Sequence, residues 1–136
     1  MFKKNILPED LVLKLNEKAI NFDISRYEDF LFELCGDWDF QKEAIRNSVK
    51  FYMTNQYSNT EDLFNENYEK NIEMQQFQDK TELSKNLPFP HKKACTIDLA
   101  TGTGKSWVIY GVARILLAEG FVNPCFMVVL GQRTKT

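Results

Sequence analysis

In the first part of the chain, apolar residues recur at the three-to-four-residue spacing of amphipathic helices. Pro8, followed by two acidic residues, predicts the start of a first helix, whose apolar face continues to Ala19. Ser25 and Glu28 have the spacing of a capping box, so a second helix is expected from Ser25 to Gly36, where glycine favours a helix end. We interpret both helices as packing elements without chemistry of their own.

A third helix is predicted after Asp37, because apolar positions recur at helical spacing over residues 40–53. The following stretch, residues 54–93, is rich in Asn, Gln, Glu and Lys. Its apolar positions predict one short helix around residues 63–68 and a looser one around residues 74–83. We interpret this stretch as an insertion that leaves and returns, since added loop length costs little entropy. A charge-rich helical insertion is usually a solvated cover of the domain that carries it, and the alternative is that it binds a partner.

The pattern changes from residue 94 onward. Residues 94–97 form an apolar run too short for a helix, a glycine-punctuated turn follows, and residues 107–118 form an apolar segment of helical length. Residues 125–130 form a second, strand-like apolar run. Strand, helix and parallel strand make one right-handed βαβ unit. The predicted fold class is therefore α/β: N-terminal helices followed by a βαβ unit with an incomplete parallel sheet.

These patterns divide the chain into three parts. Residues 1–58 are predicted to be an N-terminal helical segment, residues 59–93 a polar helical insertion, and residues 94–136 the start of a phosphate-binding domain. Two buried-type strands alone would leave open sheet edges and a partly uncovered apolar helix. We therefore expect the chain to be the amino-terminal portion of a longer protein.

The composition is that of a globular protein, with 43% hydrophobic residues and a net charge of −2. Neither half has the clustered Lys and Arg of a nucleic-acid footprint, so we do not expect a main DNA clamp here. Cys35, Cys95 and Cys125 lie far apart, without metal-ligand spacing, as suits a reducing cytoplasm. No signal-peptide apolar region is present, and residues 107–118 are too short to span a bilayer. We expect a cytoplasmic protein without membrane contact.

The candidate chemistry lies in residues 98–106, which we call the phosphate loop. Gly102 and Gly104 allow the backbone to curl until successive N–H groups point at a phosphate, at the positive end of a helix dipole. Lys105 can then reach the β- and γ-phosphates as the catalytic candidate, and the Ser106 hydroxyl can ligate Mg²⁺. The strict motif also asks for glycine where Leu99 stands. The predicted nucleotide-binding residues of the loop are Thr101, Gly102, Thr103, Gly104, Lys105 and Ser106.

The string Leu99-Ala-Thr-Gly-Thr-Gly-Lys-Ser106 resembles the phosphate loop of superfamily 2 DEAD/DEAH-type helicases, most closely the motor subunits of type III and type I restriction enzymes. The stretch around Phe40-Gln41 is similar to the glutamine motif of that superfamily. The resemblance implies a RecA-like domain that binds ATP and Mg²⁺, with DNA as the track of the full-length parent. Gln41 is then the adenine reader, since its amide can pair with N6 and N7 together. Phe40 or Trp38 is its stacking or packing neighbour.

Nucleoside triphosphate hydrolysis also needs a second acidic anchor for Mg²⁺ and usually an arginine at the transition state. In superfamily 2 proteins these groups come from a later acidic string and a second RecA-like domain, and Asp98 cannot be matched to the acidic anchor. We therefore expect weak nucleotide binding and negligible hydrolysis from this chain alone. Whether it is an enzyme by itself stays open.

Two other functions compete with this interpretation. The chain can act as a stand-alone nucleotide-binding or assembly module that self-associates through an exposed sheet edge. It can also be another phosphate-loop enzyme, such as a small-molecule kinase, which would bind ATP and GTP without using Gln41.

Overall fold

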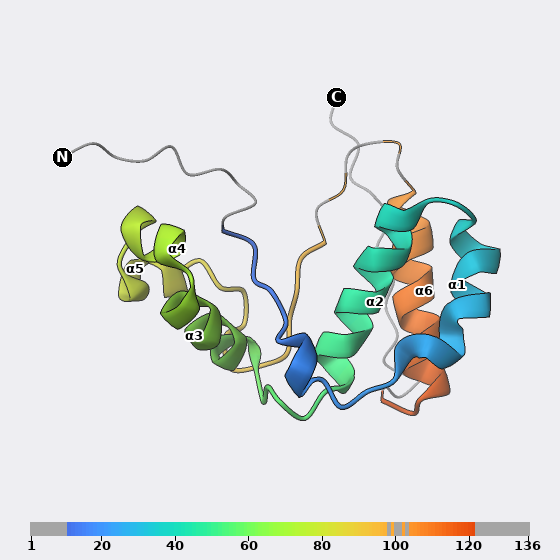
Figure 1. Cartoon of the computed structure of the whole chain (residues 1–136), viewed down its shortest axis with the longest axis horizontal. Coiled ribbons are helices and arrows are strands. Elements are labelled where there is room, and N and C mark those ends of the chain that lie inside the picture. The colour runs from blue at the N-terminus through green and yellow to red at the C-terminus, as the bar shows by residue number, and fades with distance from the viewer. Residues whose placement is uncertain (1–10, 98, 100–101, 103, 122–136) are drawn as a thin grey trace. The chain divides into compact units, whose positions relative to one another are not determined.

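The computed structural model describes residues 11–97, 99, 102 and 104–121, and this part of the chain is helical. Its elements are the 3-10 helices η2 (Glu17–Ala19) and η3 (Ile24–Tyr27), and the α-helices α1 (Glu28–Cys35), α2 (Asp39–Met53), α3 (Thr60–Lys70), α4 (Ile72–Phe77), α5 (Lys80–Ser84) and α6 (Lys105–Ala118) (Figure 1). The chain divides into two compact units. Unit 1 comprises Met1–Ile20 and Asn55–Thr96, and unit 2 comprises Asn21–Thr54 and Ile97–Thr136.

The predicted α/β fold, with a βαβ unit and an incomplete parallel sheet, is wrong: the described residues contain no β-strand. A strand needs a neighbouring strand that satisfies its backbone hydrogen-bonding groups. Among the described residues, no strand lies beside residues 94–97. The N–H of Ala94 instead donates to Thr60 Oγ1 (2.9 Å), and Ile97 packs against the helical core of unit 2. The second predicted strand, residues 125–130, lies outside the described residues.

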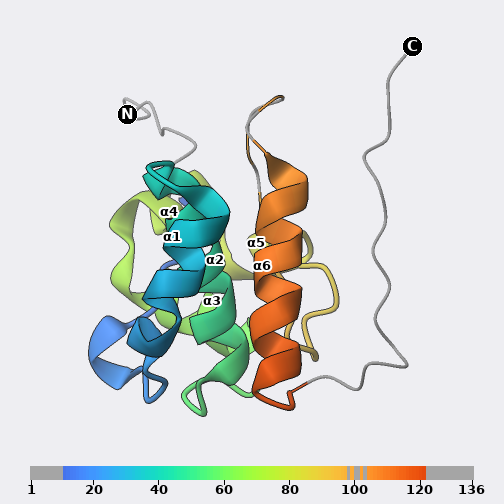
Figure 2. The same ribbon diagram turned by 90° about the vertical axis from the view of Figure 1, so that its right-hand side faces the viewer.

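The core of unit 2 is built by α1, α2 and α6, which lie side by side in both views (Figure 1 and Figure 2). Each helix contributes buried residues four or seven positions apart, the spacing of one helical face. These residues are Leu31 and Cys35 on α1, Ile45 and Val49 on α2, and Val108 and Ile115 on α6, joined by Ile24 of η3.

Only one face of α6 is covered by the described residues. Val108, Ile115 and Leu116 are buried, whereas Trp107 and Tyr110 are exposed although they belong to the same apolar segment. In the sequence, residues 107–118 are apolar on nearly all sides of the expected helix. A segment that is apolar all round does not reveal which of its faces finds a partner, and here that face is the one turned toward α1 and α2.

Local signals at helix ends agree with the structure in part. Helix α1 ends at Gly36, whose φ of 58° suits glycine. The expected capping by Ser25 is replaced by Asp23, whose side chain accepts a hydrogen bond from the Ser25 N–H (2.9 Å) and caps η3. The helix predicted from Pro8 to Ala19 is wrong over residues 12–16, which form no helix; in the described part of it, Leu11 and η2 have 3-10 geometry.

Unit 1 is held together by side chains that bond to the backbone of distant segments. The Asn67 amide on α3 accepts from the Lys14 N–H (2.7 Å) and donates to the Lys14 carbonyl (2.9 Å), so it pairs with both backbone groups of one residue. The buried Tyr57 hydroxyl donates to Glu66 Oε1 (2.7 Å). Burial and this hydrogen bond raise the pKa of Tyr57 to about 12. The helices predicted in residues 63–68 and 74–83 correspond to α3 and to α4 with α5.

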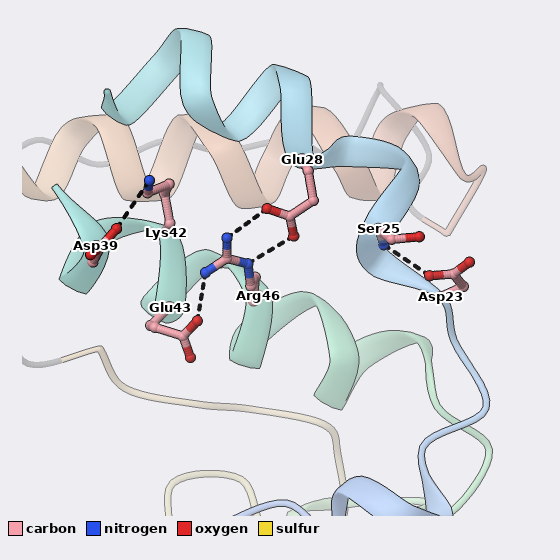
Figure 3. Close-up of polar contacts among 7 residues, drawn as sticks. All are labelled: Asp23, Ser25, Glu28, Asp39, Lys42, Glu43 and Arg46. Carbon is pink, nitrogen blue, oxygen red and sulfur yellow. Dashed lines mark hydrogen bonds and ion pairs between the residues drawn. The ribbon is translucent and has the colours of Figure 1, made fainter. Parts of the chain in front are cut away.

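Arg46 on α2 joins α2 to α1 (Figure 3). Its Nε and Nη2 donate to the two carboxylate oxygens of Glu28 at 2.9 and 2.6 Å, and its Nη1 donates to Glu43. These hydrogen bonds hold the pKa of the Glu28 carboxyl below its usual 4.5. Because the folded pKa is depressed, the contribution to stability is complete above about pH 4.5 and is lost as the pH falls through the folded value.

We therefore expect Glu28→Gln to lower the free energy of unfolding at pH 7 by less than about 1 kcal/mol, because the Glu28 side chain is 43% exposed and solvent screens the pair. The difference in stability between the variant and the unaltered chain should disappear at pH 2. Urea unfolding at pH 7 and at pH 2 checks this, with Glu33→Gln on the exposed side of α1 as the matched control. A destabilisation that is the same at pH 7 and at pH 2 would contradict the assignment.

Candidate functional site

The described part of the phosphate loop has the backbone that its glycines permit. Gly102 and Gly104 have φ values of 81° and 78°, in the left-handed region that favours glycine. Gly104 is the N-cap residue of α6, and no side chain caps the helix there. The first N–H groups of a helix have no partner within the helix, so this end presents donors and a positive dipole to an anion.

The side chain of Gln41 lies against this loop at Gly104. It is on α2 and only 3% exposed. A Cβ placed on Gly104 would lie well within 3.0 Å of the Gln41 amide nitrogen and 3.2 Å from Trp107 Cδ1. The backbone conformation therefore favours glycine at position 104, and a larger residue would also displace the Gln41 amide from the space beside the Cα. The fold thus brings the two stretches that carry the sequence resemblance into direct contact.

A pocket of about 330 Å³ opens at this contact. Its lining combines two glycines of the loop, Gln41 and two tryptophans with the last two residues of α1. The lining residues are Leu34, Cys35, Trp38, Gln41, Gly102, Gly104 and Trp107. Its volume is at the lower end of the range for small-molecule sites, and its exposed lining is more polar than apolar.

The structure places the other predicted site residues as follows. Phe40 is 44% exposed and packs its ring on Trp38, with ring centroids 5.5 Å apart, and it is not among the described residues that line the pocket. Ser106 is exposed in the first turn of α6. Lys105 begins α6, but its side chain lies outside what the structure describes, as do Thr101 and Thr103.

Three pocket residues were missed from the sequence: Leu34, Cys35 and Trp107. The sequence marks Leu34 and Cys35 as packing residues of a helix. Cys35 is indeed buried, and its burial raises the pKa of its thiol above the usual value. Trp107 was read as part of an apolar helix. The available signal was its place in the first turn of that helix, directly after Lys105 and Ser106, since the side chains of a helix tilt toward its N-terminus.

Within the described residues, no group of three or more His, Cys, Asp and Glu side chains could hold a metal ion. Cys95, predicted to sit in a buried strand, is exposed.

No protein-family model, curated protein or solved structure matches this chain. The kinship with helicase motor subunits therefore stays a prediction from the two motifs. Among the described helices, none has the length and apolar character needed to cross a membrane.

Proposed function

We propose that this chain binds ATP through its phosphate loop and Gln41, and that it is the nucleotide-binding amino-terminal part of a cytoplasmic ATP-dependent DNA helicase or translocase of the restriction-enzyme type. The observation that carries the proposal is the contact between the buried Gln41 amide and Gly104. These residues are far apart in sequence, and each belongs to one of the two motifs on which the resemblance depends.

The residues fit a nucleoside triphosphate. Gly102 leaves room for a phosphate chain beside the backbone, since even a Cβ there would meet no atom within 4 Å. The N–H groups at the start of α6 would hold the phosphate oxygens, and Lys105 would neutralise their charge. Mg²⁺, when bound together with the nucleotide, screens the phosphate charge, and Ser106 is the residue that would contact it.

Gln41 would select the base. The edge of adenine offers a donor at N6 and an acceptor at N7, which match the acceptor and the donors of one amide. Guanine offers two acceptors on the same edge, so the amide oxygen would face another acceptor. Such a two-bond contact discriminates between bases by about 1–3 kcal/mol.

Motion along DNA is proposed on the resemblance alone. Hydrolysis would need an acidic anchor and an arginine that none of the described residues supplies at the phosphate loop. We therefore expect the isolated chain to bind ATP without turning it over.

Replacement of Gln41 tests the proposal. We expect the unaltered chain to prefer ATP over GTP by about tenfold or more, and Gln41→Ala to reduce this ratio to about one, because the base edge loses its partner. Calorimetric titration with both nucleotides measures the ratio.

Gln76→Ala, on the exposed surface of α4 in unit 1, is the control and should bind both nucleotides as the unaltered chain does. A preference for ATP that persists in Gln41→Ala would show that Gln41 does not read the base. That result would favour a different phosphate-loop protein.

A further inference from the structure

Trp107 stands out on the wall of the pocket. The residue is 55% exposed, although indole is among the side chains that gain most from burial. It lies in the first turn of α6, three residues after Gly104. Trp107 Cδ1 and the Gln41 amide nitrogen are the groups that a Cβ on Gly104 would meet first. The indole and the amide therefore border the same Cα of the phosphate loop.

Trp38, the second tryptophan of the pocket, is placed differently. It is 48% exposed and already stacks on Phe40, with ring planes inclined by 34°. Among the described residues, no aromatic ring packs on Trp107 in this way. Trp107 is also the more exposed of the two indoles, so its ring is the better placed of the two to receive a ligand.

We propose that Trp107 is the surface on which the purine base of the bound nucleotide stacks while Gln41 contacts the edge of that base. This inference rests on the proposed function. A planar, exposed indole next to an amide donor and acceptor is suited to a heteroaromatic base, since stacking uses the face of the base and hydrogen bonds use its edge. The phosphate chain would lie at Gly102, where a Cβ would meet no atom within 4 Å.

The two contacts have separable effects. Every base has an aromatic face, so stacking on Trp107 strengthens the binding of ATP and GTP alike. The Gln41 amide distinguishes between the two bases, and inorganic tripolyphosphate, which has no base, uses neither contact. Loss of Trp107 should therefore lower both nucleotide affinities and leave their ratio and the affinity for tripolyphosphate unchanged.

The test is calorimetric titration of the full chain with ATP, GTP and tripolyphosphate in the presence of Mg²⁺. In Trp107→Ala we expect ATP and GTP to bind about tenfold more weakly, within the roughly five- to 150-fold range of base–aromatic stacking. Trp107→Phe, which keeps an aromatic face, should retain most of the affinity. Unchanged ATP binding in Trp107→Ala, or an equal loss for tripolyphosphate, would overturn the proposal.

A second measurement does not depend on the stability of Trp107→Ala. The chain contains two tryptophans, so Trp38→Phe leaves Trp107 as the only indole. Its fluorescence should be quenched by ATP and by GTP but not by tripolyphosphate. If ATP binds by calorimetry and the emission does not change, the stacking proposal fails while the proposed function stands. If ATP does not bind at all, the proposed function fails as well.

Discussion

Gly104→Ala should weaken ATP binding by about tenfold or more and abolish the preference for ATP over GTP. An alanine at a φ of 78° costs about 1–2 kcal/mol in backbone strain, which lowers the stability of the folded chain. Its Cβ would also collide with the Gln41 amide. That amide ends a flexible side chain and can yield, but it then leaves the place from which it would contact the base, at a further cost of about 1–3 kcal/mol. Calorimetric titration with ATP and GTP measures both effects.

Gly102→Ala is a matched control for Gly104→Ala. Gly102 has nearly the same φ, 81°, but a Cβ there would meet no atom within 4 Å. It should show the backbone strain and keep the preference for ATP. A second comparison uses the Gln41→Ala background, in which Gly104→Ala no longer meets the amide and should add only the strain. If Gly102→Ala and Gly104→Ala lower the ATP-to-GTP ratio equally, the contact between Gln41 and Gly104 is not what sets base preference.

The second large effect concerns the packing of unit 2. Gly111 lies inside α6, where a Cβ would be 2.6 Å from Ile45 Cδ1 and 3.0 Å from Leu34 Cδ2. Ile45 is completely buried, so it has little room to move. We expect Gly111→Leu to lower the free energy of unfolding by about 3 kcal/mol, at the upper end of the usual cost of overpacking a core. Leucine is a better helix former than glycine by about 0.8 kcal/mol, so a loss of stability would come from packing.

Urea unfolding followed by tryptophan fluorescence measures this loss in unit 2, because Trp38 and Trp107 both belong to that unit. Ala118→Leu, at an exposed position of the same helix, is the control and should change stability little. In Gly111→Ala, the additional change Ile45→Val removes the atom nearest to the new methyl group. The two changes together should cost less than the sum of their separate effects. A Gly111→Leu chain as stable as the unaltered one would mean that α6 does not approach Ile45 this closely.

Helices with a strong apolar periodicity could be predicted from the sequence. The spacing of Ile45 and Val49 on α2 and the glycine at position 36 after α1 are local signals, and local signals decide where such helices form and end. The helix expected at Pro8 lacked this regularity, and residues 12–16 form no helix.

Whether residues 94–97 join a sheet could not be predicted from local signals. Residues 94–97 have the apolar run of a buried strand, but a strand exists only when another segment pairs with it, and pairing is a property of the whole chain. In the structure, Ile97 and Leu99 meet the buried helix faces of unit 2 instead. A short apolar run is equally compatible with both outcomes.

The backbone conformation of the candidate site could be predicted from the sequence. The positive φ values of Gly102 and Gly104 follow from the glycines, and the resemblance paired Gln41 with the phosphate loop. The pocket walls were not predictable, because lining depends on how α1 and α6 cross. Phe40 and Trp38 looked equivalent in the sequence, and only the helix geometry turns Trp38 to the pocket.

The central claim is that the pocket beside Gly104 binds an adenine nucleotide. Titration of the unaltered chain with ATP and Mg²⁺, followed by tryptophan emission, tests it most directly, because both tryptophans of the chain line this pocket. We predict a saturable change in emission that inorganic phosphate does not produce. Emission that stays constant up to millimolar ATP, in a chain that circular dichroism shows to be folded, would contradict the claim.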